Sequence, residues 1–330
     1  MKVLVTGANG LLGHHIVFEL LRQKHKVSVI IRSKQNIYFD LNEVEVHIGN
    51  FTDYEQLSSA SLGCDAIIHA AAITTHNLIH YEDYQKINTF GVGLVVRIAN
   101  ELNIEKIVFV STANTVGFGE PDQLADETFP VCFPFSKSYY TQSKVEAERI
   151  FMDAAFEKGK HIVIINPTFM IGAFDTKPSS GKLILRAYRK RILVIPGGGK
   201  NFVPVTDVAN VVCNSLSQGR SGERYLVSGE NLSFAEFYTL QKRIGDYKQL
   251  IISIPDFFLE TVGKAGDLIR KFGIKTEICS MNLQQLMIRE YYTNTKAKKE
   301  LGLKPTSLEN AITDALDWFN NSQHQKGSHN

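Results

Sequence analysis

Several features are scarce in this chain of 330 residues, and each scarcity removes a class of function. Cysteines are few and far apart, with no C-x-x-C pair and no Cys/His cluster at metal-ligand spacing, which argues against a disulfide framework or a cysteine-bound metal. No apolar run approaches the ~20 residues of a membrane span, and Met1 leads directly into a strand-like run, so we expect no signal peptide. The cysteines are Cys64, Cys132, Cys213 and Cys279. We therefore predict reduced thiols, no metal and a cytoplasmic location.

The chain also lacks an excess of charge of either sign. Lys and Arg number 36 against 34 Asp and Glu, a formal net charge of +2, so no global field favours nucleic acid or an anionic membrane. We expect a small-molecule partner, with no nucleic acid and no membrane. The length fits one large α/β unit, or a nucleotide-binding core with a smaller lobe.

Short β-branched runs alternate with longer amphipathic stretches through the first half of the chain. This pattern predicts a doubly wound (Rossmann) parallel sheet of the α/β class, with helices on both faces and ligands at the carboxyl ends of the strands. The expected strands are 3–5, 27–31, 44–48, 66–69, 107–110 and 162–165. The expected helices lie near 11–23, 53–61, 81–102 and 138–158.

The alternation loosens after Asn166-Pro167, where Pro, Gly and Ser become frequent, as in 177–181. An amphipathic C-terminal helix is expected from about 307 to 319, and it carries the only Trp of the chain. The pattern favours interleaved lobes. We predict a nucleotide-binding domain over 1–166, a smaller and mainly substrate-binding lobe over 167–319 with segments of about 200–228 returning to the core, and a frayed tail over 320–330.

The run T-G-A-N-G-L-L-G over 6–13 follows the first expected strand and opens the first expected helix. In this context Gly7 permits a tight turn, Gly10 lets the backbone approach a pyrophosphate, and Gly13 lets the helix pack closely on the sheet. Free N–H groups at the helix start would face the phosphates. The residues expected to contact the cofactor here are Gly7, Asn9, Gly10, Leu11, Leu12 and Gly13.

The end of the second strand selects between the two dinucleotides, because its last residue reaches the adenosine ribose about 20 residues beyond the glycines. An acidic residue there would repel a 2′-phosphate, but this chain has Arg32 followed by Ser33 and Lys34. A guanidinium binds phosphate through two charge-assisted hydrogen bonds, so NADP(H) is favoured over NAD(H). The alternative is a solvated arginine at a strand end.

Further cofactor contacts are expected at the next two strand ends. Asn50, through its amide, and Phe51, through its backbone, follow the third strand and would flank the adenine. Ala70, Ala71 and Ala72 follow the fourth strand and would lie under the middle of the cofactor. His69, which precedes them, is interpreted as a packed core histidine.

Tyr140 and Lys144 form a Y-x-x-x-K pair about 130 residues after the glycine motif. Residues four apart on a helix share one face, so both side chains can reach the same cofactor. A neighbouring ammonium lowers the pKa of a phenol, so Tyr140 is expected to exchange a proton with a carbonyl or alcohol oxygen, while Lys144 holds the nicotinamide ribose. Without the glycine motif, structural roles would be the default interpretation of such a pair.

A hydroxyl is also needed to hold the substrate oxygen, and the end of the fifth strand supplies two. We select Thr112, with Ser111 as the second candidate, because a hydroxyl can donate to the substrate oxygen while it accepts from Tyr140. Spacing alone does not separate the two.

With these motifs the chain resembles the extended short-chain dehydrogenases/reductases, and among them the dihydroflavonol-4-reductase-like group of NADPH-dependent carbonyl reductases. The resemblance spans nearly the whole chain and includes 86–91, 166–172, 202–209 and 296–302. It implies that Thr112 takes the place of a catalytic serine, that Asn88 lies near the active site and Pro167 beside the nicotinamide, and that some members form homodimers through the helices near 81–102 and 138–158.

The chain departs from the family pattern in ways that bear on function. Asn50 stands where Asp is frequent, and no acidic residue follows Thr112, which counts against a sugar-nucleotide dehydratase. The resemblance implies that segments containing Phe118, Phe133, Phe135 and Phe169 fold over the substrate, which favours an apolar or aromatic carbonyl compound, although these rings would serve equally in a core. The leading hypothesis is an NADPH-dependent carbonyl reductase. The alternatives are an NAD-dependent sugar-nucleotide epimerase and a non-catalytic NADP-sensing regulator.

Overall fold

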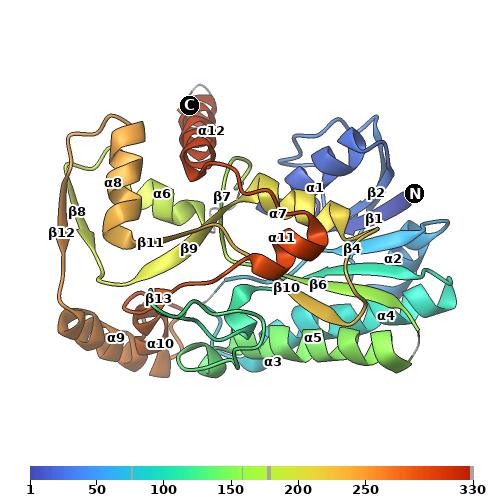
Figure 1. Cartoon of the computed structure of the whole chain (residues 1–330), viewed down its shortest axis with the longest axis horizontal. Coiled ribbons are helices and arrows are strands. Elements are labelled where there is room, and N and C mark those ends of the chain that lie inside the picture. Colours follow the sequence, from blue (N-terminus) through green and yellow to red (C-terminus); the bar gives the residue numbers. More distant parts are fainter. Residues whose placement is uncertain (76, 158, 177–179, 328–330) are drawn as a thin grey trace.

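A seven-stranded parallel sheet forms the centre of the larger lobe (Figure 1). The computed structural model describes residues 1–75, 77–157, 159–176 and 180–327. The strand order is β10-β6-β5-β4-β1-β2-β3, and every neighbouring pair is parallel. The strands are β1 (Lys2–Thr6), β2 (Lys26–Ile31), β3 (Val44–Ile48), β4 (Ala66–His69), β5 (Lys106–Val110), β6 (His161–Pro167) and β10 (Glu223–Val227). From β1 the chain adds β2 and β3 on one side of the sheet and then β4, β5 and β6 on the other. This change of direction between β1 and β4 places a crevice for ligands at their carboxyl ends.

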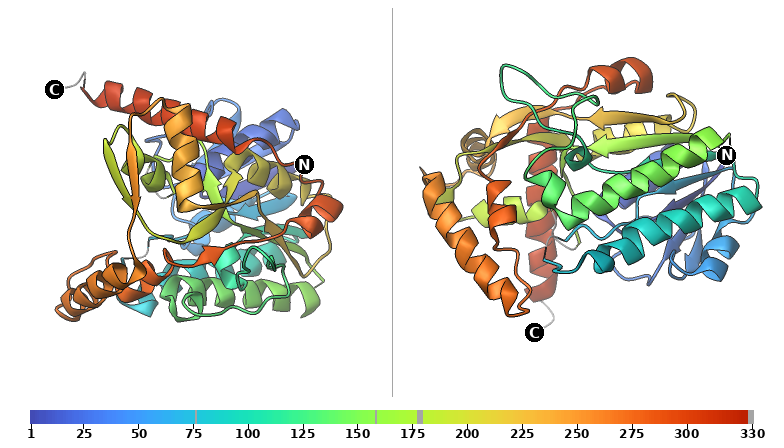
Figure 2. Two further views of the ribbon diagram at one scale, coloured as in Figure 1. Left: turned by 60° about the vertical axis from the view of Figure 1, so that its left-hand side comes forward. Right: turned by 90° about the horizontal axis from the view of Figure 1, so that it is seen from below.

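Helices cover both faces of this sheet, and each face has its own apolar core. Helices α1 and α7 pack together on one face, and α2, α4 and α5 lie on the other, as the views in Figure 2 show. The helices of this lobe are α1 (Leu11–Arg22), α2 (Tyr54–Ser61), α3 (Tyr81–Tyr84), α4 (Phe90–Glu101), α5 (Tyr139–Glu157) and α7 (Val205–Asn214). Strand residues that are buried on both faces explain the continuous Val/Ile runs in the sequence. The predicted fold class is therefore confirmed.

Within the region of the helix expected near 81–102, the structure shows a change of helical type. A π-helical turn over Gln85–Thr89 connects α3 to α4. The wider turn carries Asn88, whose side chain bonds the backbone N–H and carbonyl of Ile73 at 2.8 and 3.1 Å. This anchor ties the helix to the segment that follows β4.

The smaller lobe contains two further sheets and its own apolar core. Its larger sheet has the order β11-β9-β13, with β7 also paired to β9, and β12 pairs with β8 in a two-stranded ribbon. The strands are β7 (Phe169–Ile171), β8 (Ile192–Ile195), β9 (Gly199–Pro204), β11 (Glu230–Ser233), β12 (Leu250–Ser253) and β13 (Arg289–Glu290). The helices are α6 (Gly181–Ala187), α8 (Phe234–Ile244), α9 (Asp256–Lys271), α10 (Ser280–Gln284), α11 (Thr295–Leu301) and α12 (Leu308–Gly327).

The chain crosses between the two lobes more than once. After β9, helix α7 and strand β10 belong to the larger lobe, and the apolar side chains of α11 also join its core. The final helix α12 continues to Gly327, whereas the sequence predicted an end at Phe319 and a frayed tail, because residues 320–326 contain neither proline nor glycine to stop it. Residues 177–179 of the expected 177–181 stretch, residue 158 of the helix expected near 138–158, and residues 328–330 of the tail lie outside the described residues.

Candidate active site

The glycine-rich turn packs directly against the end of β4. Gly7 has a φ of +75°, and a Cβ on it would lie 2.7 Å from the backbone nitrogen of Ala71. A Cβ on Gly13 would lie 2.0 Å from the carbonyl oxygen of Gly7. Both positions therefore require glycine. The turn thus brings the glycine motif beside Ala70 and Ala71, two of the residues predicted to lie under the cofactor, and Ala72 follows them in the chain.

The N-terminus of α1 has the features of an anion site. Gly10 is the N-cap, it makes no side-chain capping hydrogen bond, and no acidic residue occurs in the first turn. Leu11 and Leu12 bury their side chains in the core, so only their backbone N–H groups face the turn, beside Asn9. Uncapped N–H groups at a helix start, in a cradle that a Cβ would fill, fit a dinucleotide pyrophosphate.

Arg32 lies at the carboxyl end of the sheet, directly after β2. Its side chain is exposed, as are those of Ser33 and Lys34. Within the described part of the chain, Arg32 makes no hydrogen bond or ion pair, so its five N–H donors are available to a ligand.

The predicted adenine contacts after β3 are already engaged in local structure. Asn50 accepts a hydrogen bond from the Thr52 N–H at 3.2 Å and donates its own backbone N–H to the Gln56 side chain at 2.7 Å. The Phe51 ring packs against His69, with 5.3 Å between ring centroids. Its backbone is therefore the part left for an adenine, as the sequence indicated.

His69 itself is a core residue, as predicted. Its ring is 1% exposed, it bonds the Thr6 hydroxyl at 2.9 Å, and it stacks on Phe109. Burial lowers its pKa to about 3, so the imidazole is neutral and serves packing.

Tyr140 and Lys144 lie on one face of α5, next to the end of β5, and both are buried. The Tyr140 phenol is hydrogen-bonded to the Thr112 side chain. The Lys144 Nζ donates to the Val110 carbonyl at 2.8 Å and lies 4.1 Å from the centre of the Phe109 ring. The predicted tyrosine, lysine and threonine are thus brought together at one strand end.

Burial dominates the protonation of this pair. It raises the pKa of Tyr140 to about 12, which the hydrogen bond with Thr112 only partly offsets. It lowers the pKa of Lys144 to about 7, against a smaller opposing effect of the Glu148 carboxylate. The sequence predicted that the ammonium would lower the tyrosine pKa. The structure differs because Lys144 is itself desolvated and directed to a backbone carbonyl.

The structure separates the two candidate hydroxyls that spacing left open. Ser111 donates a short hydrogen bond to the Glu148 carboxylate, away from Tyr140. The Thr112 oxygen accepts from the Asn114 N–H at 3.3 Å and contacts the phenol of Tyr140. This geometry favours Thr112 as the substrate-binding hydroxyl.

Glu148 is a buried acidic residue that our sequence analysis did not identify. One of its oxygens accepts from Ser111, from the Thr115 hydroxyl at 2.6 Å and from the Asn166 amide at 2.7 Å. Its other oxygen lies 3.5 Å from Arg224. A signal was present, because Glu148 is four residues beyond Lys144 on the same helical face. The carboxylate fixes the ends of β5 and β6 around Thr112.

The two positions implied by the family resemblance also lie at this edge. Asn88 donates to the Ser143 hydroxyl of α5 at 3.0 Å, one residue before Lys144. Pro167 ends β6, where it pairs in register with Val227. The neighbouring Asn166 donates to the Thr112 carbonyl at 3.0 Å, which ties Pro167 to the same strand ends.

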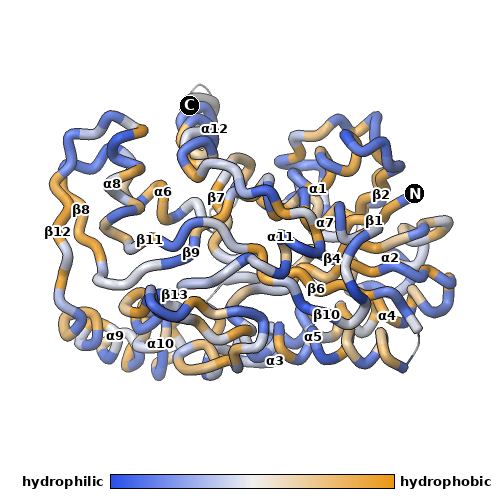
Figure 3. Tube along the Cα trace, in the orientation of Figure 1, coloured by the Kyte–Doolittle hydropathy of each residue, from blue (hydrophilic) through white to orange (hydrophobic). Residues whose placement is uncertain are grey.

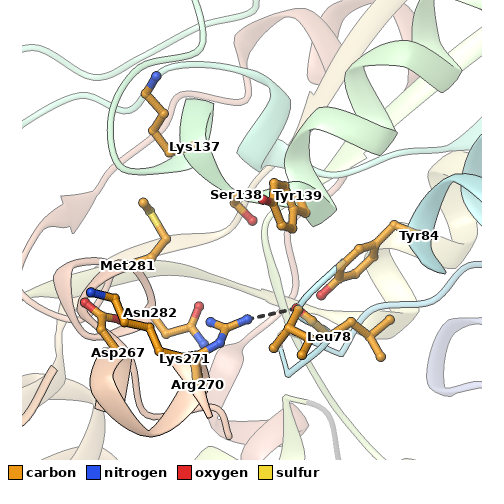
Figure 4. A pocket seen from close by; sticks show the side chains of 11 residues that line it. Leu78, Tyr84, Lys137, Ser138, Tyr139, Asp267, Arg270, Lys271, Met281 and Asn282 are labelled. Carbon is orange, nitrogen blue, oxygen red and sulfur yellow. Dashed lines mark hydrogen bonds between the residues drawn. The ribbon is translucent and has the colours of Figure 1, made fainter. Parts of the chain in front are cut away.

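A cavity of about 350 Å³ lies beside the start of α5 (Figure 4). Its wall on the side of the larger lobe includes Tyr84, Ser138 and Tyr139, and the opposite wall comes from α9 and α10. Tyr84 also contacts Tyr140, with 6.4 Å between ring centroids. The cavity is therefore next to the catalytic candidates, at the junction of the two lobes.

The four phenylalanines considered for substrate binding do not line this cavity. Phe118 packs against the fully buried Phe135, and Phe169 packs against Phe202 in the smaller lobe. Phe133 is 55% exposed. Three of these rings therefore serve packing in this structure.

The fold and these strand ends are those of a dinucleotide-binding protein that carries a tyrosine-lysine pair. The sequence pattern of the NAD dependent epimerase/dehydratase family matches residues 3–228, and the chain belongs to this family. The predicted resemblance to the extended short-chain dehydrogenases/reductases is thus confirmed, and with it a nicotinamide cofactor.

Relatives similar over nearly their whole length carry names of reductases and sterol enzymes. A putative dihydroflavonol 4-reductase of Synechocystis is 29% identical, with 98% of this chain and 95% of that protein covered. The sterol demethylase protein B of Methylococcus capsulatus is 26% identical, with 97% and 98% covered. A 4-hydroxy-2-methyl-3-oxo-4-farnesyl-3,4-dihydroquinoline-1-oxide ketoreductase of Stigmatella aurantiaca is 27% identical, with 96% of each covered. The similarities support an oxidoreductase that acts on CH–OH or carbonyl groups.

Solved structures show the same fold. The crystal structure of gox2253 superposes with a TM-score of 0.82 at 29% identity, covering 97% of this chain and 98% of that one. A UDP-glucose 4-epimerase of Thermotoga maritima gives 0.76 at 18% identity, with 98% and 100% covered, and at this identity it shares the fold alone. In the described residues no helix has the length and apolarity needed to cross a membrane. Nor do these residues include a group of three or more His, Cys, Asp and Glu placed to hold a metal.

Proposed function

We propose that this protein is an NADPH-dependent reductase of a carbonyl group, an aldehyde or a ketone, in a small molecule. The observation that carries the proposal is the buried phenol of Tyr140, hydrogen-bonded to Thr112 and with its pKa raised to about 12. A phenol that keeps its proton at neutral pH is ready to donate it, as reduction of a carbonyl requires. Oxidation of an alcohol would need the phenolate.

Side chains at the end of β5 and at the start of α5 would each have a separate role in the reduction. The Thr112 hydroxyl would donate to the carbonyl oxygen, and Tyr140 Oη would transfer its proton to the same oxygen. Lys144 would leave the Val110 carbonyl to hold the nicotinamide ribose. When bound, NADPH would supply the hydride.

The cofactor would lie along the carboxyl edge of the sheet. The Gly7–Gly13 turn would hold the pyrophosphate, Asn50 and Phe51 would flank the adenine, and Ala70–Ala72 and Pro167 would line the path to the nicotinamide. We assign Arg32 to the 2′-phosphate, because it is exposed at the strand end with its donors unused by the described residues.

The substrate class is inferred from the relatives and the cavity. The relatives are named as a putative dihydroflavonol reductase, a sterol-carboxylate dehydrogenase and a farnesyl-dihydroquinoline-oxide ketoreductase. The compounds in these names contain rings or long apolar groups. Leu78, Ile79, Tyr84 and Met281 give the cavity an apolar portion, next to charged groups of α9. We therefore propose a mainly apolar or aromatic carbonyl compound with one polar end.

The test is NADPH oxidation by the purified protein with a panel of aromatic aldehydes, cyclic ketones and 3-ketosteroids. We expect turnover with at least one class, and we expect Tyr140→Phe to abolish it while NADPH still binds. Absence of turnover across the panel, or full activity in Tyr140→Phe, would sink the proposal. Two further measurements separate the alternatives. Tightly held NAD, released when the protein is denatured, would point to an epimerase. NADPH binding without turnover would point to a sensor.

A further inference from the structure

Helix α9 presents its apolar face outward. Its buried residues are Gly263 and Gly266, and a Cβ on Gly266 would lie 1.9 Å from the Ile278 carbonyl oxygen. Phe257 and Leu268 lie opposite these glycines, and Phe258, Val262 and Ile269 lie along one flank of the helix; all five are 44–58% exposed. A surface helix of a globular protein normally buries its apolar stripe and exposes the polar one. Here the glycines allow close packing on the inside, and the apolar stripe is left without a partner in the described chain.

The exposed apolar surface continues beyond this helix. Strand β12 leads through Pro255 into α9, and the β8–β12 ribbon exposes Ile192, Val194, Leu250 and Ile252 on its outer side. Figure 1 shows the ribbon and the helix along one end of the smaller lobe, and the hydropathy colouring of Figure 3 marks β8 and β12 as apolar. Phe272, directly after α9, is 76% exposed. We call this surface, from the β8–β12 ribbon to Phe272, the apolar edge.

Positive charge is concentrated around the apolar edge. The segments 182–194, 242–252 and 256–278 contain twelve Lys and Arg against five Asp and Glu, whereas the whole chain has 36 against 34. Arg189, Lys190 and Arg191 immediately precede β8, Lys248 lies just before β12, and all four are exposed. The sequence prediction of no membrane partner used the global charge, which conceals this local excess.

We propose that the apolar edge docks on the surface of an anionic lipid bilayer. Phenylalanine and leucine side chains on an amphipathic helix insert into the boundary between headgroups and acyl chains, and neighbouring Lys and Arg bind the anionic headgroups. A second copy of the chain fits less well, because it would bring the same excess of Lys and Arg to the contact, whereas an anionic bilayer complements that charge. The docking lays α9 in the plane of the interface and requires no membrane-spanning segment.

The docking would place the cavity beside the lipid. Asp267 and Arg270, on the inner side of α9, line the cavity whose other wall includes Tyr139 (Figure 4). On the proposed function, an apolar carbonyl compound dissolved in the bilayer would then reach the site past one helix. Lipid docking is measured without cofactor or substrate. A protein that does not bind vesicles can therefore still prove to be a reductase, and a protein that lacks reductase activity can still bind them.

The experiment is co-sedimentation of the full chain with vesicles of phosphatidylcholine alone and with one quarter phosphatidylglycerol. We expect binding to both, with stronger binding to the anionic vesicles. The double variant Phe258→Ser/Phe272→Ser should lower binding to either by at least about tenfold. The triple variant Lys190→Gln/Arg191→Gln/Lys248→Gln should remove most of the anionic preference, a loss of at least about tenfold.

Matched controls remove equally exposed side chains elsewhere. Phe90→Ser/Phe156→Ser removes rings that are 68% and 78% exposed on α4 and α5, and Lys298→Gln/Lys299→Gln/Lys304→Gln removes three exposed charges on α11 and just after it. Both should bind vesicles like the wild type, and circular dichroism should show all variants folded. The proposal is overturned if the wild type does not bind anionic vesicles, or if the controls lose binding equally. A wild-type dimer that Phe258→Ser/Phe272→Ser dissociates in sedimentation velocity would assign the edge to a second copy instead.

Discussion

The phenol of Tyr140 and the side chain of Thr112 share a hydrogen bond that joins helix α5 to the end of strand β5. Because Ser111, next in the chain, donates to Glu148, only one of the two hydroxyls contacts the tyrosine that we propose as the proton donor. Thr112→Ala should lower kcat for carbonyl reduction about a hundredfold with little change in NADPH affinity. Steady-state kinetics and a cofactor titration measure the two quantities.

Two companion variants make this prediction specific. Thr112→Ser keeps the hydroxyl and loses a methyl, so it should retain activity within about tenfold of the wild type. Ser111→Ala removes a donor to Glu148, so it should lower the free energy of unfolding. Its kcat should stay closer to the wild-type value than that of Thr112→Ala. The assignment of Thr112 fails if Ser111→Ala loses more kcat than Thr112→Ala.

Arg32 is expected to select the cofactor. Arg32→Asp replaces a guanidinium at the strand end by a carboxylate, which would repel a 2′-phosphate and accept a hydrogen bond from a 2′-hydroxyl. The Kd of NADPH should rise at least about tenfold while that of NADH stays equal or falls. Fluorescence titration with both dinucleotides checks this, and NADH is the internal control for folding. If NADPH binds the variant as it binds the wild type, the arginine does not select the phosphate.

The larger lobe was predictable from sequence because its strands are buried on both faces. Continuous Val and Ile runs such as 107–110 and 162–165 are typical of such strands, and the structure extends the first by one residue and the second by three. The smaller lobe was not predictable at this level. Its strands, such as β7 and β13, are two to six residues long and pair across large sequence separations, so their local patterns are weak.

The candidate site shows the same division between local and tertiary information. The sequence predicted that Tyr140 and Lys144 share one face, because helix geometry fixes residues four apart. It did not predict the direction in which each pKa shifts, because those shifts depend on burial. Similarly, the periodicity of α9 indicates an amphipathic helix but not which side meets the protein. The orientation follows from Gly263 and Gly266, whose contacts with 278–280 are tertiary.

Glu148 is expected to act as a positioning residue. Glu148→Gln keeps the shape of the side chain, removes the charge opposite Arg224, and presents an N–H group to donors. Because the buried carboxylate accepts hydrogen bonds from Ser111, Thr115 and Asn166, its replacement should lower the free energy of unfolding by about 3 kcal/mol. Urea denaturation measures this, with the exposed Glu157→Gln on the same helix as the control. A role in positioning Thr112 further requires that kcat falls while the KM for NADPH is retained, and equal kcat in both variants would reduce Glu148 to a purely structural group.

Lys144 should make stability depend on pH in a defined window. Its pKa is about 7 in the folded chain, because burial disfavours the ammonium, and 10.5 as the reference value for the unfolded chain. Between these values the unfolded state binds more protons, so stability rises with pH, by about 2 kcal/mol from pH 7 to pH 9 for this group alone.

Lys144→Met lacks the titrating amine and should flatten that part of the profile while abolishing reduction. The measurement is the free energy of unfolding of both proteins at pH 7, 8 and 9. Lys160→Met is the control, because Lys160 also donates to backbone carbonyls but is only half-buried. Profiles for wild type and Lys144→Met that run parallel across this window would show that the amine is not desolvated as the structure indicates.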